Sequence, residues 1–326
     1  MRIWRCGYRL LAIALLIASA TTAIAQDYPA RVIRLIVPFP PGGSTDIYAR
    51  ILAKELQASW GQSGVIDNRP GATGLIGTDL ARRAAPDGYT LLFTSNTAHV
   101  LGPLLHNPRP FDAAADFTPI TKVLRFPLYL VVHPSVPVKS LKEFIAFGKS
   151  RPGQLIFASS GQGGTSHVVA ELFNDVAGIK ATHVPYKGTS PALQAVMSGE
   201  THYIFNNIGV SHPLVLSGRL KGLAVTGEKR SPALPDVPTA GEMGVRGLEN
   251  AYTWLGLLAP AKLPQAILTK LSTEVVRIMR TPEMEKRVLN DGYVPVANAP
   301  AQFRSEIQAE VATWSRVIRE RGIKVE

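Results

Sequence analysis

The stretch Val37–Leu52, VPFPPGGSTDIYARIL, joins the end of an apolar strand to a proline- and glycine-rich turn and then to a helix start. The prolines stiffen the turn, whereas Gly42 and Gly43 carry no side chain and let a ligand approach the backbone. Ser44 is the expected N-cap, and the apolar spacing after it predicts a helix over 44–60. Because helix-start amides point outward at the positive end of the helix dipole, the turn predicts an anion site.

The same pattern recurs 121 positions further along the chain. Gly42–Asp46 aligns with Gly163–His167, and Ala49 aligns with Ala170. In both copies a β-rich run precedes the glycines, and apolar residues at helical spacing follow them. One anion-binding turn in each half of the chain predicts two lobes that close on one anionic ligand.

The first 25 residues have the three parts of a secretory signal. A basic start precedes the apolar run Leu10–Ser19, and Ala23-Ile24-Ala25 forms a small-residue cleavage site before Gln26. A buried N-terminal helix is the alternative, but it would not require all three parts. We therefore expect export from the cytoplasm. The single cysteine, Cys6, lies in the removed segment, so no disulfide or thiolate site is expected in the mature protein.

The charge balance is basic. The formal net charge is +11, and removal of Arg2, Arg5 and Arg9 with the signal lowers it to +8. The remaining lysines and arginines are scattered and are not interleaved with aromatic residues, so we expect no nucleic-acid partner. A positive field favours small anions, although the charge could equally serve solubility alone.

Alternating strand-like and helix-like segments predict an α/β protein whose mostly parallel sheets are flanked by helices. The β-rich segment Phe117–His133, interrupted by Pro127, is long enough to pass from one sheet into a second, and Thr253–Leu258 is the expected return strand. Two long helices, from Pro264 and from near Pro300, are expected to close the chain. The predicted divisions are a signal peptide at 1–25, lobe 1 at 26–126 plus 227–290, lobe 2 at 127–226, and a C-terminal segment at 291–326 of unassigned lobe.

Catalytic motifs are weak. The sequence contains no G-x-S-x-G elbow and no H-E-x-x-H or other close histidine pair with zinc-ligand spacing. Gly148-Lys149-Ser150 matches the end of the phosphate-binding P-loop motif, but the first glycine of that motif is absent. Ser95, His99 and Asp46 could be combined into a Ser-His-Asp catalytic triad, but any chain of this length offers such a combination. We therefore expect no cofactor and no metal, and a hydrolase or isomerase that uses His167 and Asp46 is the enzyme alternative.

Three candidate side chains each have two interpretations. Asp46 could compensate the helix dipole, which we favour, or bind a ligand ammonium. His167 could donate to the ligand or pack against the sheet edge. Tyr186 could contact the ligand or fill space between lobes, and Lys187 is a cation near the predicted cleft.

Four long runs carry a family resemblance: YPARVIRLIVPFPPGGSTDIYARILAKEL, VIDNRPGATGLIGTDLARRAAPDGYTLLF, VPYKGTSPAL and EKRSPALPDVPTAGEMGV. From about Tyr28 onward the chain resembles the Bug (TctC-like) family, the periplasmic receptors of tripartite tricarboxylate transporters. The resemblance implies a two-lobed type II periplasmic-binding-protein fold with two crossover strands. It also implies capture of a small organic carboxylate without catalysis, by a monomer that delivers it to membrane permease subunits. A periplasmic ligand sensor of the same fold is the alternative.

The resemblance also implies the ligand contacts. Asn206 stands where many relatives have an aspartate, so an acid that could bind a ligand amine is missing, which favours a carboxylate without an amino group. Ser190 replaces a more usual alanine, a substitution whose effect the sequence does not predict. By position the implied contacts are Pro41, Gly42, Gly43, Asp46, Ser95, Asn96, Ser160, Gly161, Thr165, Ser166, His167, Tyr186, Lys187, Gly188 and Asn206.

Overall fold

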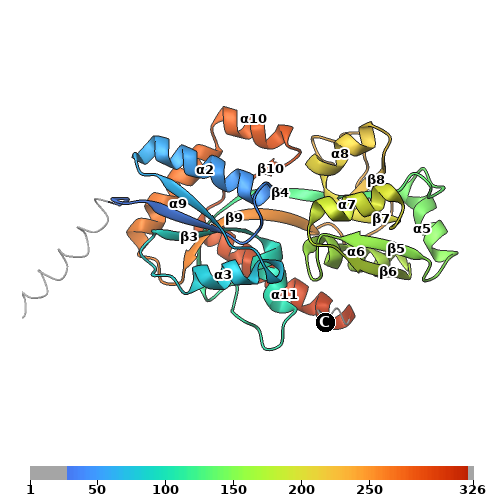
Figure 1. The fold of residues 1–326 in the computed structure, drawn as a ribbon, viewed down its shortest axis with the longest axis horizontal. Coiled ribbons are helices and arrows are strands. Elements are labelled where there is room, and N and C mark those ends of the chain that lie inside the picture. Colours follow the sequence, from blue (N-terminus) through green and yellow to red (C-terminus); the bar gives the residue numbers. More distant parts are fainter. Residues whose placement is uncertain (1–27, 322–326) are drawn as a thin grey trace, which may run out of the picture.

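The computed structural model of the protein describes residues 28–321, so the predicted signal peptide lies outside the described residues. Two α/β lobes lie side by side and are connected through β4 (Phe117–Val132) and through the segment that enters β9 (Tyr252–Pro260) (Figure 1). The two-lobed architecture predicted from the sequence is therefore confirmed.

The first lobe is built on a sheet in the order β2-β1-β3-β9-β4, with the short β10 paired to β4. The strands β2, β1 and β3 are parallel, whereas β9 runs antiparallel to both of its neighbours, so the sheet is mixed. Along β1 the side chains alternate between two clusters: Leu35 and Val37 pack with α2 and with α9 (Gln265–Met279), and Ile36 packs with α3. The bounds are β1 Ile33–Val37, α2 Ser44–Trp60, β2 Gly64–Asn68, α3 Leu75–Arg82, β3 Thr90–Ser95, α4 Gly102–Leu104 and β10 Val294–Pro295.

The second lobe repeats this plan with the other half of β4. Its parallel strands β7, β5 and β6 follow β4, and β8 pairs along the opposite edge of β4. Phe144 and Phe173 place α5 and α6 on one face, and Leu193 and Ile208 place α7 and α8 on the other. The bounds are α5 Leu141–Lys149, β5 Leu155–Ser159, α6 Thr165–Ala177, β6 Ala181–Pro185, α7 Thr189–Ser198, β7 Tyr203–Asn207, α8 Ile208–Leu216 and β8 Lys221–Val225.

The crossover occurs inside β4. Its first part pairs with β9 as far as Pro127 opposite Tyr252, and from Leu128 onward it pairs with β7, starting at Asn207. Proline has no N–H to donate, so the ladder can change partners there. The predicted passage of 117–133 from one sheet to the other is confirmed.

Thr226 fastens the two connections between the lobes to each other. Its backbone N–H donates to Leu128 O at 2.9 Å, and its side-chain oxygen accepts from Leu128 N at 2.8 Å. The same hydroxyl donates to Ala251 O, and Thr226 has no exposed surface. One buried hydroxyl thus joins β4 to the returning chain at the boundary between the sheets.

The loop that follows β8 contacts the second lobe. Val225 N donates to Pro238 O at 2.9 Å, and Ala240 N donates to Val225 O at 2.8 Å. Leu234 packs in the cluster that contains Tyr129 and Ile204. These contacts favour a second lobe that continues beyond the predicted end at residue 226, to about residue 251. The domain boundaries as a whole stay a prediction.

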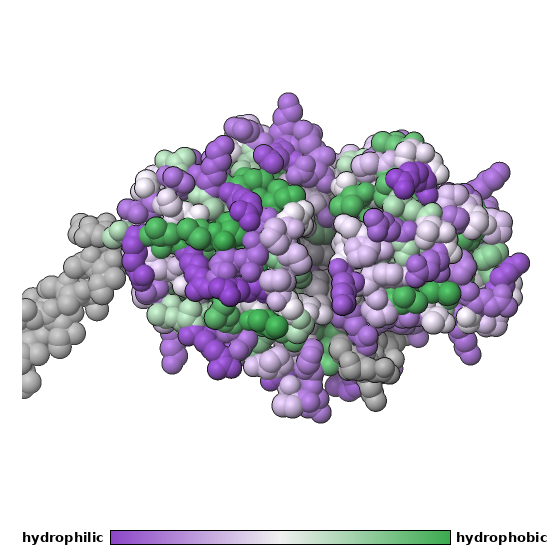
Figure 2. Space-filling view, in the orientation of Figure 1, coloured by the Kyte–Doolittle hydropathy of each residue, from purple (hydrophilic) through white to green (hydrophobic). Residues whose placement is uncertain are grey.

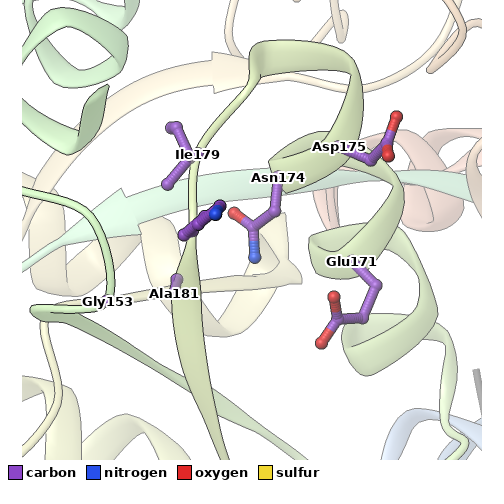
Figure 3. A pocket seen from close by; sticks show the side chains of 7 residues that line it. Gly153, Glu171, Asn174, Asp175, Ile179 and Ala181 are labelled. Carbon is purple, nitrogen blue, oxygen red and sulfur yellow. The ribbon is translucent and has the colours of Figure 1, made fainter.

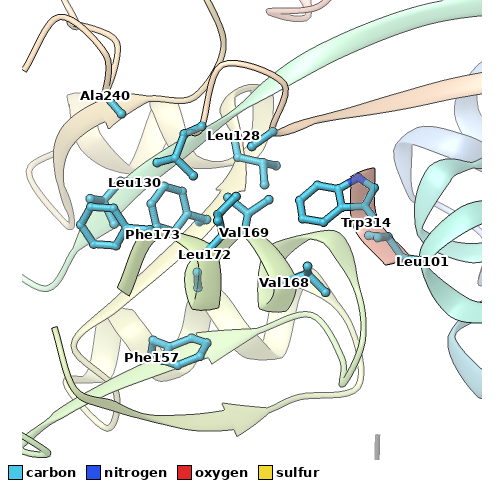
Figure 4. Close-up of a cluster of buried hydrophobic side chains, with 14 of the residues drawn as sticks. Leu101, Leu128, Leu130, Phe157, Val168, Val169, Leu172, Phe173, Ala240 and Trp314 are labelled. Carbon is cyan, nitrogen blue, oxygen red and sulfur yellow. The ribbon is translucent and has the colours of Figure 1, made fainter. Parts of the chain in front are cut away.

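Three helices follow β9: α9 (Gln265–Met279), α10 (Pro282–Asn290) and α11 (Pro300–Arg321). The two long helices match their prediction, whereas α10 was missed. Phe303 of α11 packs edge-on against Trp254 in the first lobe, with ring centroids 5.0 Å apart. Further along α11, Trp314 lies between Leu101 and the cluster that contains Val168 of the second lobe (Figure 4). The C-terminal helix therefore supports the first lobe and touches the second.

Thr226→Val should lower the free energy of unfolding by about 1–3 kcal/mol, because a buried N–H and a buried C=O each lose a partner. Urea denaturation measures this, with Thr182→Val on the exposed side of β6 as the control. A loss no larger than the control's would contradict the assigned role of Thr226.

Candidate functional site

Two helices begin at glycine turns, one in each lobe. The N-cap of α2 is Gly43 and the N-cap of α6 is Gly164, and neither helix start is capped by its own N-cap side chain. The prediction of Ser44 as N-cap is wrong, because Gly43 has the extended backbone of a cap (φ −81°, ψ 166°) and Ser44 is already helical. The first amides of both helices have no acceptor within their helix, which suits an anion. At α6 one of them, Thr165 N, donates to Thr97 Oγ1 of the first lobe at 3.4 Å.

The lobes meet across a furrow that Figure 2 shows between them. The hydroxyl of Thr97 in the first lobe is hydrogen-bonded to that of Thr165 at the start of α6, at 2.6 Å. The Thr73 hydroxyl donates to Gln162 O at 3.1 Å. Both contacts hold the second glycine turn against the first lobe.

A third link across the furrow uses Tyr293, which precedes β10. Its hydroxyl accepts from Asn207 Nδ2 at 2.7 Å and is also hydrogen-bonded by Ser44 at the start of α2. Burial, the dominant influence, raises the pKa of Tyr293, so the phenol stays neutral at physiological pH. The first turn is thereby connected to the end of β7, where Asn206 lies.

The rim of the furrow carries backbone strain. Ala72 and Thr73 have φ values of 47° and 55°, in the left-handed region that non-glycine residues seldom adopt. Such strain persists only where surrounding contacts enforce it, and it concentrates at functional sites. Here the contact to Gln162 O accompanies it.

Asp46 is occupied by its own turn. Its carboxylate accepts from Gly42 N at 3.0 Å, from Arg50 Nε at 3.0 Å and from Asn68 Nδ2 at 2.9 Å. Burial raises the pKa of Asp46, but the hydrogen bonds from Arg50, Gly42 and Asn68 outweigh it and leave the pKa below its usual value. Asp46 therefore holds its own turn at the helix start, which favours its role as a helix-start residue over a ligand partner.

The loop before α6 is organised by its serines. Ser166 Oγ accepts from Ser160 N at 3.0 Å and is hydrogen-bonded to the Ser160 hydroxyl at the same distance. Gly188 N donates to Ser160 O at 3.1 Å, which places the 186–188 loop beside this one. The predicted second-lobe contacts therefore lie together.

His167 is buried against β5 and β6. Its Nδ1 accepts from Gly163 N at 3.0 Å, and its ring stacks on His183 with centroids 3.8 Å apart. Burial lowers the pKa of His183 to about 3, with His167 as the second cause, so His183 is neutral. The packing interpretation of His167 gains support from these contacts.

Asn96 links the loop after β3 to distant parts of the first lobe. Its Nδ2 donates to Tyr252 O at 2.9 Å and to Glu310 of α11 at 2.8 Å, while Trp254 Nε1 donates to the other Glu310 oxygen at 2.6 Å. Burial raises the pKa of Glu310, with the Trp254 and Asn96 bonds and Lys122 opposing it. The amide nitrogen of Asn96 thus positions the loop, whereas Asn96 Oδ1 has no partner among the described residues.

Exposure separates the predicted contacts into two groups. The Tyr186 hydroxyl donates to Glu200 of the same lobe at 2.6 Å, so both interpretations of Tyr186 stay predictions. Asn206 is buried, and its Nδ2 has no partner in residues 28–321. Exposed or half-buried are Pro41, Gly42, Gly43, Ser160, Gly161, Tyr186, Lys187 and Gly188, and buried are Asp46, Ser95, Asn96, Thr165, Ser166, His167 and Asn206. Their contact with a ligand stays a prediction.

Sequence reasoning missed four residues that join the lobes: Thr73, Thr97, Gln162 and Tyr293. The first three had a signal, because each lies in a polar turn directly after a strand. Tyr293 had none, since its partners are separated from it by more than 80 positions in the chain.

A cavity of about 310 Å³ lies away from the furrow, between α6 and the start of β6 (Figure 3). Glu171, Asp175 and Lys180 line it, so acids outnumber bases and it does not suit an anion.

His99 is hydrogen-bonded through Nε2 to Ala113 O at 2.8 Å and packs between aromatic rings. These contacts argue against a catalytic triad of His99 with Ser95. Within the described part of the chain no acid and histidine cluster suits a metal, and no helix there has the length and apolarity to span a membrane.

Comparisons with known proteins support one family. The model of the tripartite tricarboxylate transporter family receptor, TctC, matches residues 48–323. Protein BugT of Bordetella pertussis is 38% identical over 322 residues, 97% of this chain and 98% of BugT.

Solved structures agree. R. palustris Rpa4515 with adipate has a TM-score of 0.85 at 36% identity, over 91% of this chain and 99% of that one. MatC from Rhodopseudomonas palustris with bound malate has a TM-score of 0.80 at 32% identity, over 89% and 100%. The predicted type II periplasmic-binding-protein fold is confirmed. The chain belongs to the TctC family of tripartite tricarboxylate transporter receptors.

Proposed function

We propose that this protein is a periplasmic solute receptor that closes its two lobes on a small organic carboxylate. The observation that carries the proposal is the pair of glycine turns, one per lobe, each opening a helix whose first amides no N-cap side chain satisfies. Carboxylates suit such amides because hydrogen bonds to an anion are short and strong. Relatives with adipate and malate support this ligand class.

Closure is part of the proposal. The Thr97–Thr165, Thr73–Gln162 and Tyr293–Asn207 contacts join residues of opposite lobes. A ligand that contacts both turns would favour the state in which these contacts form. The passage of β4 between the sheets, with Thr226 beside it, provides the place where the lobes would rotate.

Two contacts favour a receptor over a hydrolase or isomerase. The Asp46 carboxylate and the His167 Nδ1 each accept a backbone N–H of their own glycine turn. A general base must instead reach a proton of the substrate. We further propose delivery to membrane permease subunits after export by the signal peptide, and a monomeric state in solution. A sensor of the same fold is distinguished by an uptake assay, since only a transport receptor would be required for uptake.

Asn206 narrows the class of carboxylate that we expect the site to bind. A buried amide N–H without a partner costs about 1–3 kcal/mol, which a ligand oxygen could recover. An ammonium group would find an uncharged amide there, because the residue at position 206 is asparagine. We therefore propose a carboxylate without an amino group.

Malate should bind at least about tenfold more tightly than aspartate, the matched ligand that has an ammonium in place of the hydroxyl. Titration calorimetry measures both, and Asn206→Asp should narrow the difference. Aspartate binding as tightly as malate would contradict the proposed selectivity, and native mass spectrometry of the purified protein would identify any ligand that co-purifies.

Gly43→Val should weaken carboxylate binding at least about tenfold, because a side chain at the N-cap folds over the first amides of the helix. The backbone tolerates the change, since an added Cβ would lie 4.0 Å from its nearest neighbour, Pro40 O. Gly241→Val is the control, at a turn of the second lobe where a Cβ also fits. Unchanged affinity in calorimetry, with a melting temperature close to that of the control, would contradict a role for the first turn.

A further inference from the structure

The two glycine turns share one backbone conformation. Gly42 and Gly163 both have positive φ, 87° and 72°, and the next glycines are both extended, with φ/ψ of −81°/166° at Gly43 and −72°/165° at Gly164. The first helical hydrogen bonds match as well, at 2.9 Å to Gly43 O and 3.0 Å to Gly164 O. The sequence repeat is thus a structural repeat.

Each turn is held by an acceptor four residues after its first glycine. Gly42 N donates to Asp46 Oδ2 and Gly163 N donates to His167 Nδ1, both at 3.0 Å. One turn further along each helix stands a residue of the complementary charge. Arg50 contacts Asp46 at 3.0 Å, and Glu171 faces His167 Nε2 at 3.7 Å. The two lobes therefore hold their glycine turns in the same way. The first lobe uses a carboxylate supported by a guanidinium, and the second uses an imidazole that faces a carboxylate.

We propose that His167 is a positioning residue that holds the second glycine turn in its binding conformation only while its imidazole is neutral. The proposal rests on the proposed function, because it assigns a role in the same site. A neutral imidazole that accepts at Nδ1 carries its proton on Nε2, the nitrogen that faces Glu171. An imidazolium donates from both nitrogens, so Gly163 N–H would lose its acceptor.

The contacts of His167 define what else could titrate near it. From its own helix it faces Glu171, and from β6 it stacks on His183 at 3.8 Å with an interplanar angle of 9°. From β5 it meets Phe157, which is apolar, at 6.2 Å. His183 is hydrogen-bonded to Ser159 Oγ at 2.7 Å and remains neutral under mildly acidic conditions. Among these described neighbours, Glu171 is the acidic side chain that faces the His167 ring.

Asp46 supplies the internal contrast. Its carboxylate has a lowered pKa, so the first turn keeps its acceptor across the mildly acidic range. Acid conditions should accordingly release the second turn and spare the first. Binding to the closed protein needs both turns, so affinity should fall on acidification through the second lobe alone.

The test compares His167→Ala, which removes the acceptor, with His167→Asn, whose side-chain oxygen can accept from Gly163 N–H and does not titrate. Calorimetry with malate from pH 8 to pH 5 should show wild-type affinity falling about five- to tenfold relative to His167→Asn. The ratio of the two affinities at each pH cancels the effect of malate's own titration. His167→Ala should bind about five- to tenfold more weakly at pH 8, and His167→Asn should rescue most of that loss.

A parallel pH dependence of wild type and His167→Asn, or a His167→Ala variant that binds like wild type, would overturn the inference while leaving the proposed function intact. Failure of wild type to bind any carboxylate would instead defeat the proposed function. The ligand-free protein gives an independent reading. The Gly163 amide proton shift in NMR should change between pH 8 and pH 5 in wild type and stay constant in His167→Asn, whereas a constant wild-type shift would overturn the inference.

Discussion

The structure depends on two helix starts, those of α2 and α6, where glycine stands in place of a capping side chain. A helix start leaves its first N–H groups without intrahelical acceptors, and proteins usually satisfy some of them with a serine, threonine or aspartate at the N-cap. Both helices here have glycine at that position and use no capping side chain from it. The nearby acceptors, Asp46 and His167, bind the preceding turn instead. At the start of α6, Thr165 N donates to Thr97 Oγ1 of the first lobe at 3.4 Å, so this helix start takes part in the contact between the lobes.

Buried polar contacts at the lobe boundary make that arrangement possible. Thr226 fixes the place where β4 leaves one sheet for the other, and Glu310 ties the C-terminal helix to Asn96 beside the furrow. Each of these groups is costly to bury without its partners, which makes the contacts specific. The long C-terminal helix, to which the sequence assigned no lobe, thus supports the loop that follows β3.

Local patterns predicted much of the fold. The helix over 44–60, the crossover in β4 and the paired turns follow from apolar spacing, proline positions and the repeat. Other features depend on tertiary contacts. Ser44 looks like an N-cap by residue type, but Gly43 has the cap backbone and Ser44 binds Tyr293. The helix α10 did have a local signal, a Thr281 cap followed by proline and acids, which was overlooked. The loops of the candidate site follow from the sequence, whereas the roles of Asp46 and His167, which lie in the first turns of α2 and α6, depend on their hydrogen-bond partners.

The most direct test of the account is the response of both turns to one ligand. Backbone amide NMR of the ¹⁵N-labelled protein, titrated with malate, should shift the signals of residues 43–46 and of residues 164–167 along one saturation curve. Such coupling is expected if one carboxylate ligand is held between two helix starts in different lobes. Saturable binding that leaves either set of signals unmoved would contradict it.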